Sequence, residues 1–373
     1  MKTIFTILIL LSFFFYDSSV QAQGCVAIRS TGNVCMMSHP EGSEAHNSKQ
    51  WVLSTNFRYF KSFRHFSGTT ENKARLEQGT EVINHSGTMD INLTRILNNR
   101  WSLMVDMPIL ANSRSSLYEH GLINGKNDFN QRHTMHSFGI GDMRLAAYYW
   151  LLNPLKHTRG NIQVGLGVKL PTGDYDYKDY WYNVGPNGTK ELRPVDQSIQ
   201  LGDGGTGFTT EVNLFQNITK NFGVYSNGYY LINPREQNGV HTYRETLVAT
   251  LANEAIMSVP DQYMARAGVS YAFSGKVKGL SAAAGVRLEG IPVHDLVGGS
   301  GDFRRPGYVW SIEPTINYSL KKFSAFASVP MAFVRNRTQS VTDKENSIKY
   351  SKHIQGDAAF ADYSISAGVA FKF

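Results

Sequence analysis

The sequence predicts an all-β membrane protein, a transmembrane antiparallel up-and-down β-barrel of about 12 strands, and three observations predict it. Apolar residues recur at every second position in segments rich in Val, Ile, Tyr, Phe and Thr. The connections between these segments are alternately long and short. The chain opens with an export signal and ends on an alternating segment that closes with Phe373, as outer-membrane barrels do.

The N-terminus predicts export. Lys2 precedes an apolar run from Ile4 to Tyr16, and Val20-Gln21-Ala22 is a small-x-small cleavage pattern, so we expect residues 1–22 to be a signal peptide. Arg, Asp, Asn or Gly interrupts every later apolar stretch, which leaves none of the roughly 18 to 20 residues that a spanning helix needs. We therefore predict a periplasmic or plug segment at 23–49 and an outer-membrane barrel at 50–373.

Composition limits the function classes. The chain has 373 residues, 42% of them hydrophobic and 18% charged, enough apolar surface for a large ordered structure. Its net charge of +7 is spread along the chain without a dense basic run, so a nucleic-acid partner is not expected.

The alternating segments define the expected strands. They span residues 51–59, 89–93, 101–109, 143–151, 162–170, 208–214, 222–232, 265–273, 280–288, 310–318, 323–333 and 363–373. About 14 strands would result if the long connections at 66–88 or 233–262 contained a further pair.

The connections favour a membrane barrel over a soluble sandwich. Short turns are expected at 98–100, 153–160, 216–221, 274–279 and 319–322. Long loops are expected at 61–88, 111–137, 171–206, 233–262, 290–307 and 335–361. Short periplasmic turns and long extracellular loops are typical of outer-membrane barrels, whereas a sandwich has no reason to show this asymmetry.

Charged residues lie between the apolar positions of the strands. Facing lipid, each Arg or Lys would cost about 2 to 4 kcal/mol near the membrane midplane, so the apolar face is expected outside and the charged face in the lumen. The predicted lumen-facing residues are Arg58, Asp106, Asp142, Arg144, Lys169, Glu211, Arg266, Arg287, Glu289 and Glu313. Twelve strands enclose a narrow lumen, and pairing of these arginines with carboxylates would fill it.

Three glycine-rich stretches carry a resemblance. They are Gly139–Asp142, Leu170–Asp174 and Leu201–Gly207, each at an expected strand end. Together they resemble the outer-membrane family of meta-pathway phenol-degradation proteins, which is grouped with long-chain fatty-acid and aromatic-hydrocarbon transporters. The resemblance is concentrated between about residues 138 and 215. It implies a channel-like barrel for small hydrophobic or aromatic compounds.

The segment 23–49 contains the only two cysteines, Cys25 and Cys35. In an oxidising compartment we expect an intrachain disulfide between them. Metal binding with His39 and His46, lipidation of Cys25 and free thiols are the alternatives, and the spacing fits no known zinc pattern. This segment is expected to plug the lumen or to dock a periplasmic protein partner.

The loop at 171–206 contains aromatic residues interleaved with carboxylates. Tyr175, Tyr177 and Trp181 are candidates to stack on an aromatic or sugar ligand, and the carboxylates could bind calcium. The alternative is an external loop folded over the barrel mouth.

We expect no enzymatic activity, cofactor or resident metal. Ser226-Asn227-Gly228 resembles part of a barrel phospholipase motif, but Val224 occupies the position where that motif needs its histidine base.

Two functions remain open. The first is passive passage of a small, hydrophobic or aromatic solute across the bacterial outer membrane, driven by the solute's own gradient. The second is a non-conducting barrel subunit that docks partners in a larger outer-membrane complex through its N-terminal segment and loops.

Overall fold

The computed structural model describes residues 50–117, 119–120, 131–242, 247, 251, 253–301 and 303–373. The predicted signal peptide and the segment 23–49, with the Cys25–Cys35 disulfide, lie outside the described residues.

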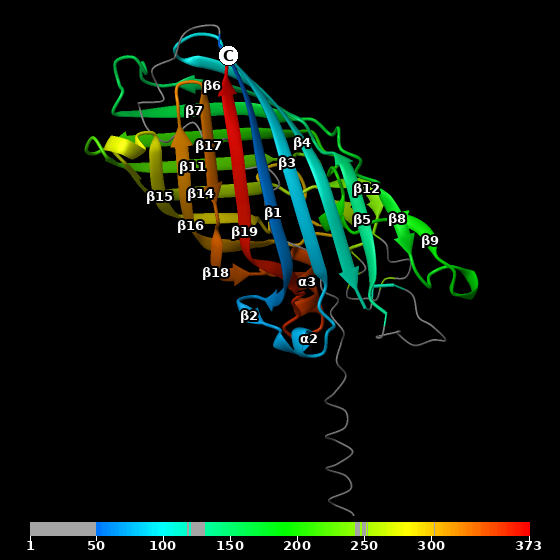
Figure 1. Ribbon diagram of the computed structural model, residues 1–373. Helices are drawn as coiled ribbons and strands as arrows, with labels where there is room; N and C mark the ends of the chain where they lie inside the picture. The colour runs from blue at the N-terminus through cyan, green and yellow to red at the C-terminus, as the bar shows by residue number, and fades with distance from the viewer. Residues whose placement is uncertain are drawn as a thin grey trace, which may run out of the picture.

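Antiparallel strands form a closed barrel in which each strand pairs with its neighbours along the chain (Figure 1). Its wall has twelve strands, of which two are interrupted and carry two labels each. In ring order they are β1 (Trp51–Ser67), β3 (Ile83–Ile96), β4 (Trp101–Ser116), β5 (His133–Ile140) with β6 (Arg144–Trp150), β7 (Gly160–Lys169), β10 (Gly207–Asn217), β11 (Phe222–Ile232), β14 (Gln262–Ala272), β15 (Leu280–Ile291), β16 (Gly307–Ser319), β17 (Phe323–Ser328) with β18 (Met331–Asn336), and β19 (Ala358–Lys372). Pairing of β19 with β1 closes the ring. The predicted fold class is confirmed.

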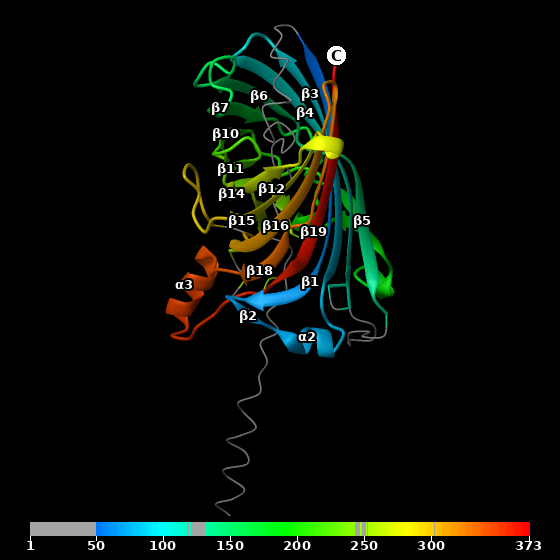
Figure 2. The same cartoon turned by 60° about the vertical axis from the view of Figure 1, so that its left-hand side comes forward.

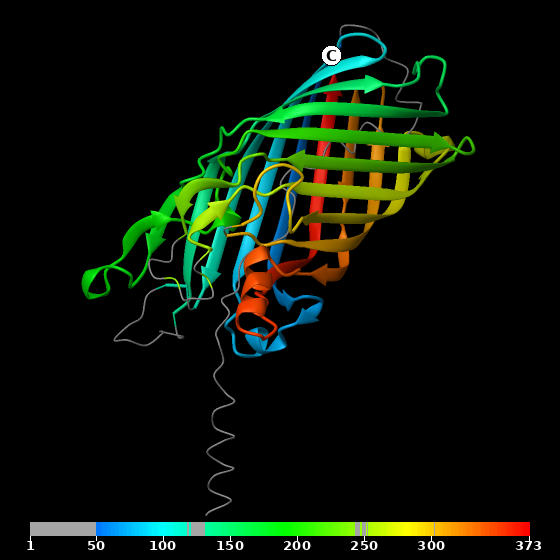
Figure 3. The same cartoon turned by 180° about the vertical axis from the view of Figure 1, so that it is seen from behind.

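The remaining elements lie outside the ring. Figures 1 and 2 place the helices α2 and α3 at the end of the barrel opposite the C-terminus, and Figure 3 shows β8 and β9 reaching beyond the wall. Hairpins β8–β9 and β12–β13 form two separate two-stranded sheets, so the long loop at 233–262 adds no strand to the barrel. These elements are β2 (Thr70–Glu71), α2 (Lys73–Glu77), β8 (Lys178–Trp181), η4 (Pro186–Gly188), β9 (Glu191–Pro194), η5 (Gln197–Ile199), β12 (Gln237–His241), β13 (Ile256–Ser258), η7 (Gly275–Val277) and α3 (Val341–Lys349). Among the described residues, no helix is both long and apolar enough to cross a bilayer.

The first and last strands meet at the end with the short turns. The backbone N–H of Trp51 donates to the carbonyl of Phe373 at 2.9 Å, and the N–H of Phe373 donates back at the same distance. The start of the first strand and the end of the last strand therefore both lie at the end of the barrel that has the short turns, as an even number of strands requires.

Each interrupted strand faces a proline in the strand beside it. Pro108 of β4 lies opposite the break between β5 and β6, and its carbonyl accepts from Gly141 N–H at 2.8 Å. Pro314 of β16 lies opposite the break between β17 and β18, and its carbonyl accepts from Val329 N–H at 3.1 Å. Proline has no N–H to offer the ladder, so the neighbouring strand loses a bond and leaves the register there.

The long-loop ends of several strands extend further than the apolar alternation predicted. The expected loop at 61–88 is largely strand, because β1 continues to Ser67 and pairs with β3 as far as Ser62 and Asn84. The outward positions there include Lys61 and His85. Strands that pass beyond lipid need no apolar outer face, so hydrophobic periodicity fades before the strand ends.

The two faces of the wall differ in polarity. On β4, Leu103 and Val105 are 46% and 39% exposed, whereas Met104 and Asp106 between them are 4% and 2% exposed. The exposed positions of the wall strands are mainly apolar, and many buried ones are polar or charged. The polarity is therefore that of a barrel in lipid, with an apolar outside and a polar interior.

Candidate functional site

Five of the predicted lumen residues form a continuous chain of ion pairs inside the barrel. Arg58 of β1 pairs with Glu289 of β15 at 2.9 Å, and Arg287 pairs with the same carboxylate at 2.8 Å. Arg287 also lies 3.5 Å from Glu313 of β16, which lies 3.5 Å from Arg266 of β14. Because β1 and β15 are not neighbours in the ring, the pair of Arg58 and Glu289 spans the interior.

Three more of the predicted lumen residues, Arg144, Glu211 and Asp106, form a second cluster. The guanidinium of Arg144 pairs with Glu211 of β10 and lies 3.8 Å from Asp106 of β4. The Tyr148 hydroxyl donates to Glu211 at 2.9 Å, and Arg144 lies 5.6 Å from the ring centre of Tyr229. The eight charged residues of the two clusters are each at most 5% exposed. Buried charges are tolerated only when they are paired, so these clusters are tightly interdependent.

Asp142 and Lys169 connect the three glycine-rich stretches. The carboxylate of Asp142 accepts from the N–H of Gly173 at 3.0 Å and from the N–H of Asp203 at 3.1 Å. Lys169 pairs with Asp203 and lies 3.5 Å from Asp142. A Cβ at Gly202 would lie 2.6 Å from the backbone carbonyl oxygen of Gly173, so this position needs glycine.

A cavity of about 150 Å³ is lined in part by residues of these clusters. Arg58, Asp106 and Arg144 line its charged side. Its apolar lining includes Leu110, Leu201, Leu231, Met257 and Ile291. A cavity of this size holds a molecule as large as benzene. Arg58 also lines a second cavity of about 30 Å³, together with Glu289.

The long loop after β7 covers the larger cavity as a lid, formed by the turn η5 and the residues after it. Gln197, Ser198, Gln200 and Leu201 all line the cavity. The side chain of Asp196 caps η5 by accepting from Ser198 N–H at 2.9 Å. The η5 part of this loop therefore lies over the cavity, whereas its hairpin β8–β9 reaches beyond the wall.

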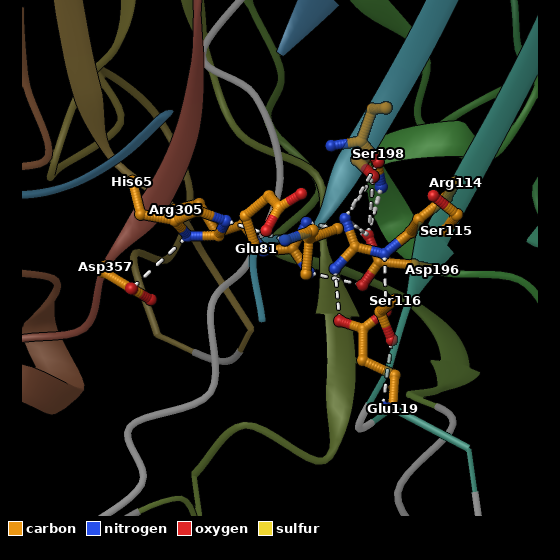
Figure 4. Close-up of polar contacts among 12 residues, drawn as sticks. His65, Glu81, Arg114, Ser115, Ser116, Glu119, Asp196, Ser198, Arg305 and Asp357 are labelled. Carbon is orange, nitrogen blue, oxygen red and sulfur yellow. Dashed lines mark hydrogen bonds and ion pairs between the residues drawn. The ribbon is translucent and has the colours of Figure 1, made fainter. Parts of the chain in front are cut away.

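Two arginines from other parts of the chain clamp this lid. Asp196 accepts from Arg305 at 2.6 and 2.9 Å, and Arg114 of β4 lies 3.7 Å away. Figure 4 shows Arg114 beside Asp196, Ser198 and Glu119. Arg114 also donates hydrogen bonds to Glu119 and to Ser198. Burial acts to raise the pKa of Asp196, but Arg114 and Arg305 outweigh it and hold that pKa well below its usual range.

The predicted loop aromatics lie within the lid loop itself. Trp181 is 1% exposed, packs with Met135, Val195 and Ile199, and donates from Nε1 to the Pro194 carbonyl at 3.1 Å. Tyr177 packs against the same cluster, and a Cβ at Gly204 would lie 2.9 Å from Cγ of Tyr175. The three are absent from the cavity lining, and their part in ligand binding stays a prediction.

Sequence reasoning missed the residues that clamp and line the lid. Arg114, Asp196 and Arg305 are far apart in the chain and carry no local motif. Gln200 and Met257 likewise come from loops without periodicity. The only available signal was their position in long connections, which is where barrels place functional groups.

Comparison with known proteins identifies the fold. An outer-membrane channel from Pseudomonas putida F1 superposes with a TM-score of 0.53 at 11% sequence identity, covering 88% of this chain and 97% of that one. The protein has the fold of an outer-membrane channel. With its apolar outer face, this places it in the bacterial outer membrane.

Other comparisons add no function. The toluene transporter TbuX of Ralstonia pickettii has a TM-score of 0.41 at 9% identity, with 95% of this chain and 98% of that chain covered. The β domain of the Bordetella autotransporter BrkA has a TM-score of 0.42 at 11% identity, with 87% and 100% covered. TM-scores under 0.5 do not indicate a shared function. No protein-family profile and no curated sequence matches the chain, so its resemblance to the meta-pathway family stays a prediction.

Proposed function

We propose that the protein is a passive outer-membrane channel for a small, hydrophobic or aromatic solute. The observation that carries this proposal is the cavity of about 150 Å³ between the lid and the charged clusters. Ligand sites combine apolar walls with a few placed polar groups, and this cavity has both.

The lining suggests how a solute would be held. Leu231 and Met257 offer apolar surface, while Arg144 and Lys169 offer charged hydrogen-bond donors. A small aromatic compound with one polar substituent matches this combination in size and in chemistry. Within the described residues no nucleotide-binding loop is present to supply energy, so transport would follow the solute's gradient.

The ion pairs would make the channel narrow. The Arg58–Glu289 bond spans the interior, so a solute moving toward the periplasm must displace or skirt this pair. Free diffusion of large hydrophilic solutes is therefore not expected.

Uptake by proteoliposomes tests the proposal. An aromatic probe such as phenol should enter vesicles that contain the protein faster than vesicles that lack it. Leu231→Trp should slow uptake to the background rate by filling the cavity, whereas Leu231→Met conserves volume and should leave it unchanged. Background uptake with the unaltered protein, with and without residues 23–49, would contradict the proposal.

The second candidate function rests on the same ion pairs. If the Arg58–Glu289 pair closes the interior permanently, the barrel would serve as a docking subunit of a larger complex. A stable partner that is lost on deletion of residues 23–49, together with no measurable conductance, would support this alternative.

A further inference from the structure

Among the described residues, the charged side chains at the short-turn end of the barrel are all basic. The described segments 95–101, 151–160, 216–222, 272–280, 319–323 and 372–373 contain ten Lys and Arg residues and none of the chain's 30 Asp and Glu residues. We call these ten residues the basic collar: Arg95, Arg100, Lys156, Arg159, Lys220, Lys276, Lys278, Lys321, Lys322 and Lys372.

Each of these segments also has an exposed apolar side chain. Five turns repeat the combination, and the C-terminus repeats it a sixth time. The exposed fractions are 43% for Leu97, 58% for Leu155, 52% for Ile218, 49% for Val277, 49% for Leu320 and 65% for Phe373. A turn projecting into water gains nothing from an apolar tip, whereas a turn at a membrane surface buries it.

Aromatic side chains locate the collar at headgroup level. Trp51 and Trp101 are 38% and 46% exposed at this end. Arg95 lies 4.8 Å from the Trp51 ring centre, and Arg100 donates to the Tyr149 hydroxyl at 2.8 Å. Exposed Trp and Tyr mark the membrane–water interface, where lipid phosphates lie.

We propose that the basic collar binds anionic phospholipid, such as phosphatidylglycerol, in the leaflet that faces the periplasm. The apolar tips reach toward the acyl chains, and the Lys and Arg head groups reach the lipid phosphates. The complementarity is one of charge, since the described turns contain basic side chains and no Asp or Glu. An acidic protein docking at the same surface would require no lipid selectivity.

Trp51 and Trp101 make the collar directly measurable, because Trp150 and Trp181 are buried at 9% and 1% exposure. The fifth tryptophan, Trp310, is half-buried on the outer face of β16 and is replaced by W310F in every chain that is measured. The full chain is reconstituted in phosphatidylcholine vesicles that contain a fraction of brominated phosphatidylglycerol or, separately, of brominated phosphatidylcholine. Brominated phosphatidylglycerol should quench tryptophan fluorescence with a relative binding constant about fivefold higher, and 0.5 M salt should reduce this preference.

A matched pair of variants assigns the effect to the collar. The variant K156Q/K220Q/K276Q/K322Q changes one exposed lysine in each of four turns and should abolish the preference. The control K73Q/K190Q/K344Q/K352Q removes the same charge from exposed lysines in the long loops and should retain it. Equal quenching by the two brominated lipids, or equal loss in both variants, would overturn the proposal.

Discussion

Arg58 and Glu289 are 231 positions apart in the chain and are joined across the barrel interior by two hydrogen bonds of 2.9 and 3.1 Å. Glu289 also accepts from Arg287 at 2.8 Å, so one carboxylate compensates two guanidinium groups. Both residues of the spanning pair are 5% exposed. Charges removed from water in this way depend on their ion pairs, which makes the pair a sensitive test of the interior.

The first prediction concerns stability. Glu289→Gln removes the charge that compensates Arg58 and Arg287 and should lower the free energy of unfolding by about 3 to 5 kcal/mol. Urea unfolding of the barrel in vesicles measures the change. Asp176→Asn is the control, since Asp176 pairs with Lys178 where both side chains are over 40% exposed, and about 1 kcal/mol or less is expected. Equal effects would show that the interior is well hydrated.

The second prediction concerns conductance. Arg58 lines both the larger and the smaller cavity, so the double variant R58S/E289S should connect them and raise single-channel conductance. R64S/E71S removes an ion pair of 2.7 Å near the long-loop end of β1 and should leave conductance unchanged. If R58S/E289S conducts no better than the unaltered protein, the pair does not limit passage.

The third prediction concerns the lid. Asp196→Asn removes the charge that Arg114 and Arg305 hold and should release η5 from the cavity, so that an aromatic probe enters vesicles faster. Asp295→Asn disrupts a similarly buried pair with Arg304 that does not line the cavity. Both variants should lose stability, and only Asp196→Asn should speed uptake; the same uptake rate in both would argue against a lid.

The pH dependence of this clamp follows from the lowered pKa of Asp196. A carboxyl group with a lowered pKa in the folded state stabilises that state fully above its unfolded pKa, which is about 3.9. The stabilisation is lost as the pH falls below that value toward the folded pKa. The contribution of Asp196 to lid closure should therefore be constant from neutral pH to about pH 4 and be lost only in stronger acid. The difference in probe uptake between the unaltered chain and D196N over that range measures this contribution.

The fourth prediction concerns His120, in the long loop after β4. Burial lowers the pKa of His120 to about 4, and the nearby His133 and Arg114 act in the same direction, against Asp179. Its Nδ1 accepts from Tyr182 N–H at 3.1 Å. The unfolded loop takes up a proton near pH 6.5 and the folded loop only near pH 4, so folding of this loop weakens as the pH falls between those values.

Amide hydrogen exchange around Tyr182 measures this weakening. Exchange should accelerate from about pH 6.5 to pH 4 after correction for the intrinsic rate. His120→Asn keeps an acceptor near the Nδ1 position without a titrating ring and should remove the acceleration. A variant that behaves like the unaltered chain would rule out His120 as the group responsible.

Much of the fold was predictable because membrane and backbone impose local rules. Period-two alternation requires only that each strand face lipid on one side, so all twelve wall strands were found. The long-loop ends of β1 and β3 were not predicted, because positions such as Lys61 and His85 lie beyond the lipid, where outward side chains need not be apolar. The strand breaks opposite Pro108 and Pro314 were not predicted, because side-chain alternation does not reveal a missing backbone hydrogen bond.

The candidate site was predictable in part. The four arginines and four carboxylates of the interior could be named from their places between apolar residues, but not which arginine meets which carboxylate. Arg287 shares Glu289 with Arg58 and Glu313 with Arg266 because strand register and the curvature of the ring set the distances. No local pattern encodes that arrangement.

The sequence alone predicted that the chain spans a membrane, the number of strands and the polarity of the two faces of the wall. These properties depend on residues two positions apart in the chain. The lid, its clamp by Arg114 and Arg305, and the cavity beneath it were decided only by the tertiary structure. Those features depend on three loops meeting at one end of a closed ring. Ring closure brings together residues that are distant in the chain, and only the folded barrel determines which of them touch.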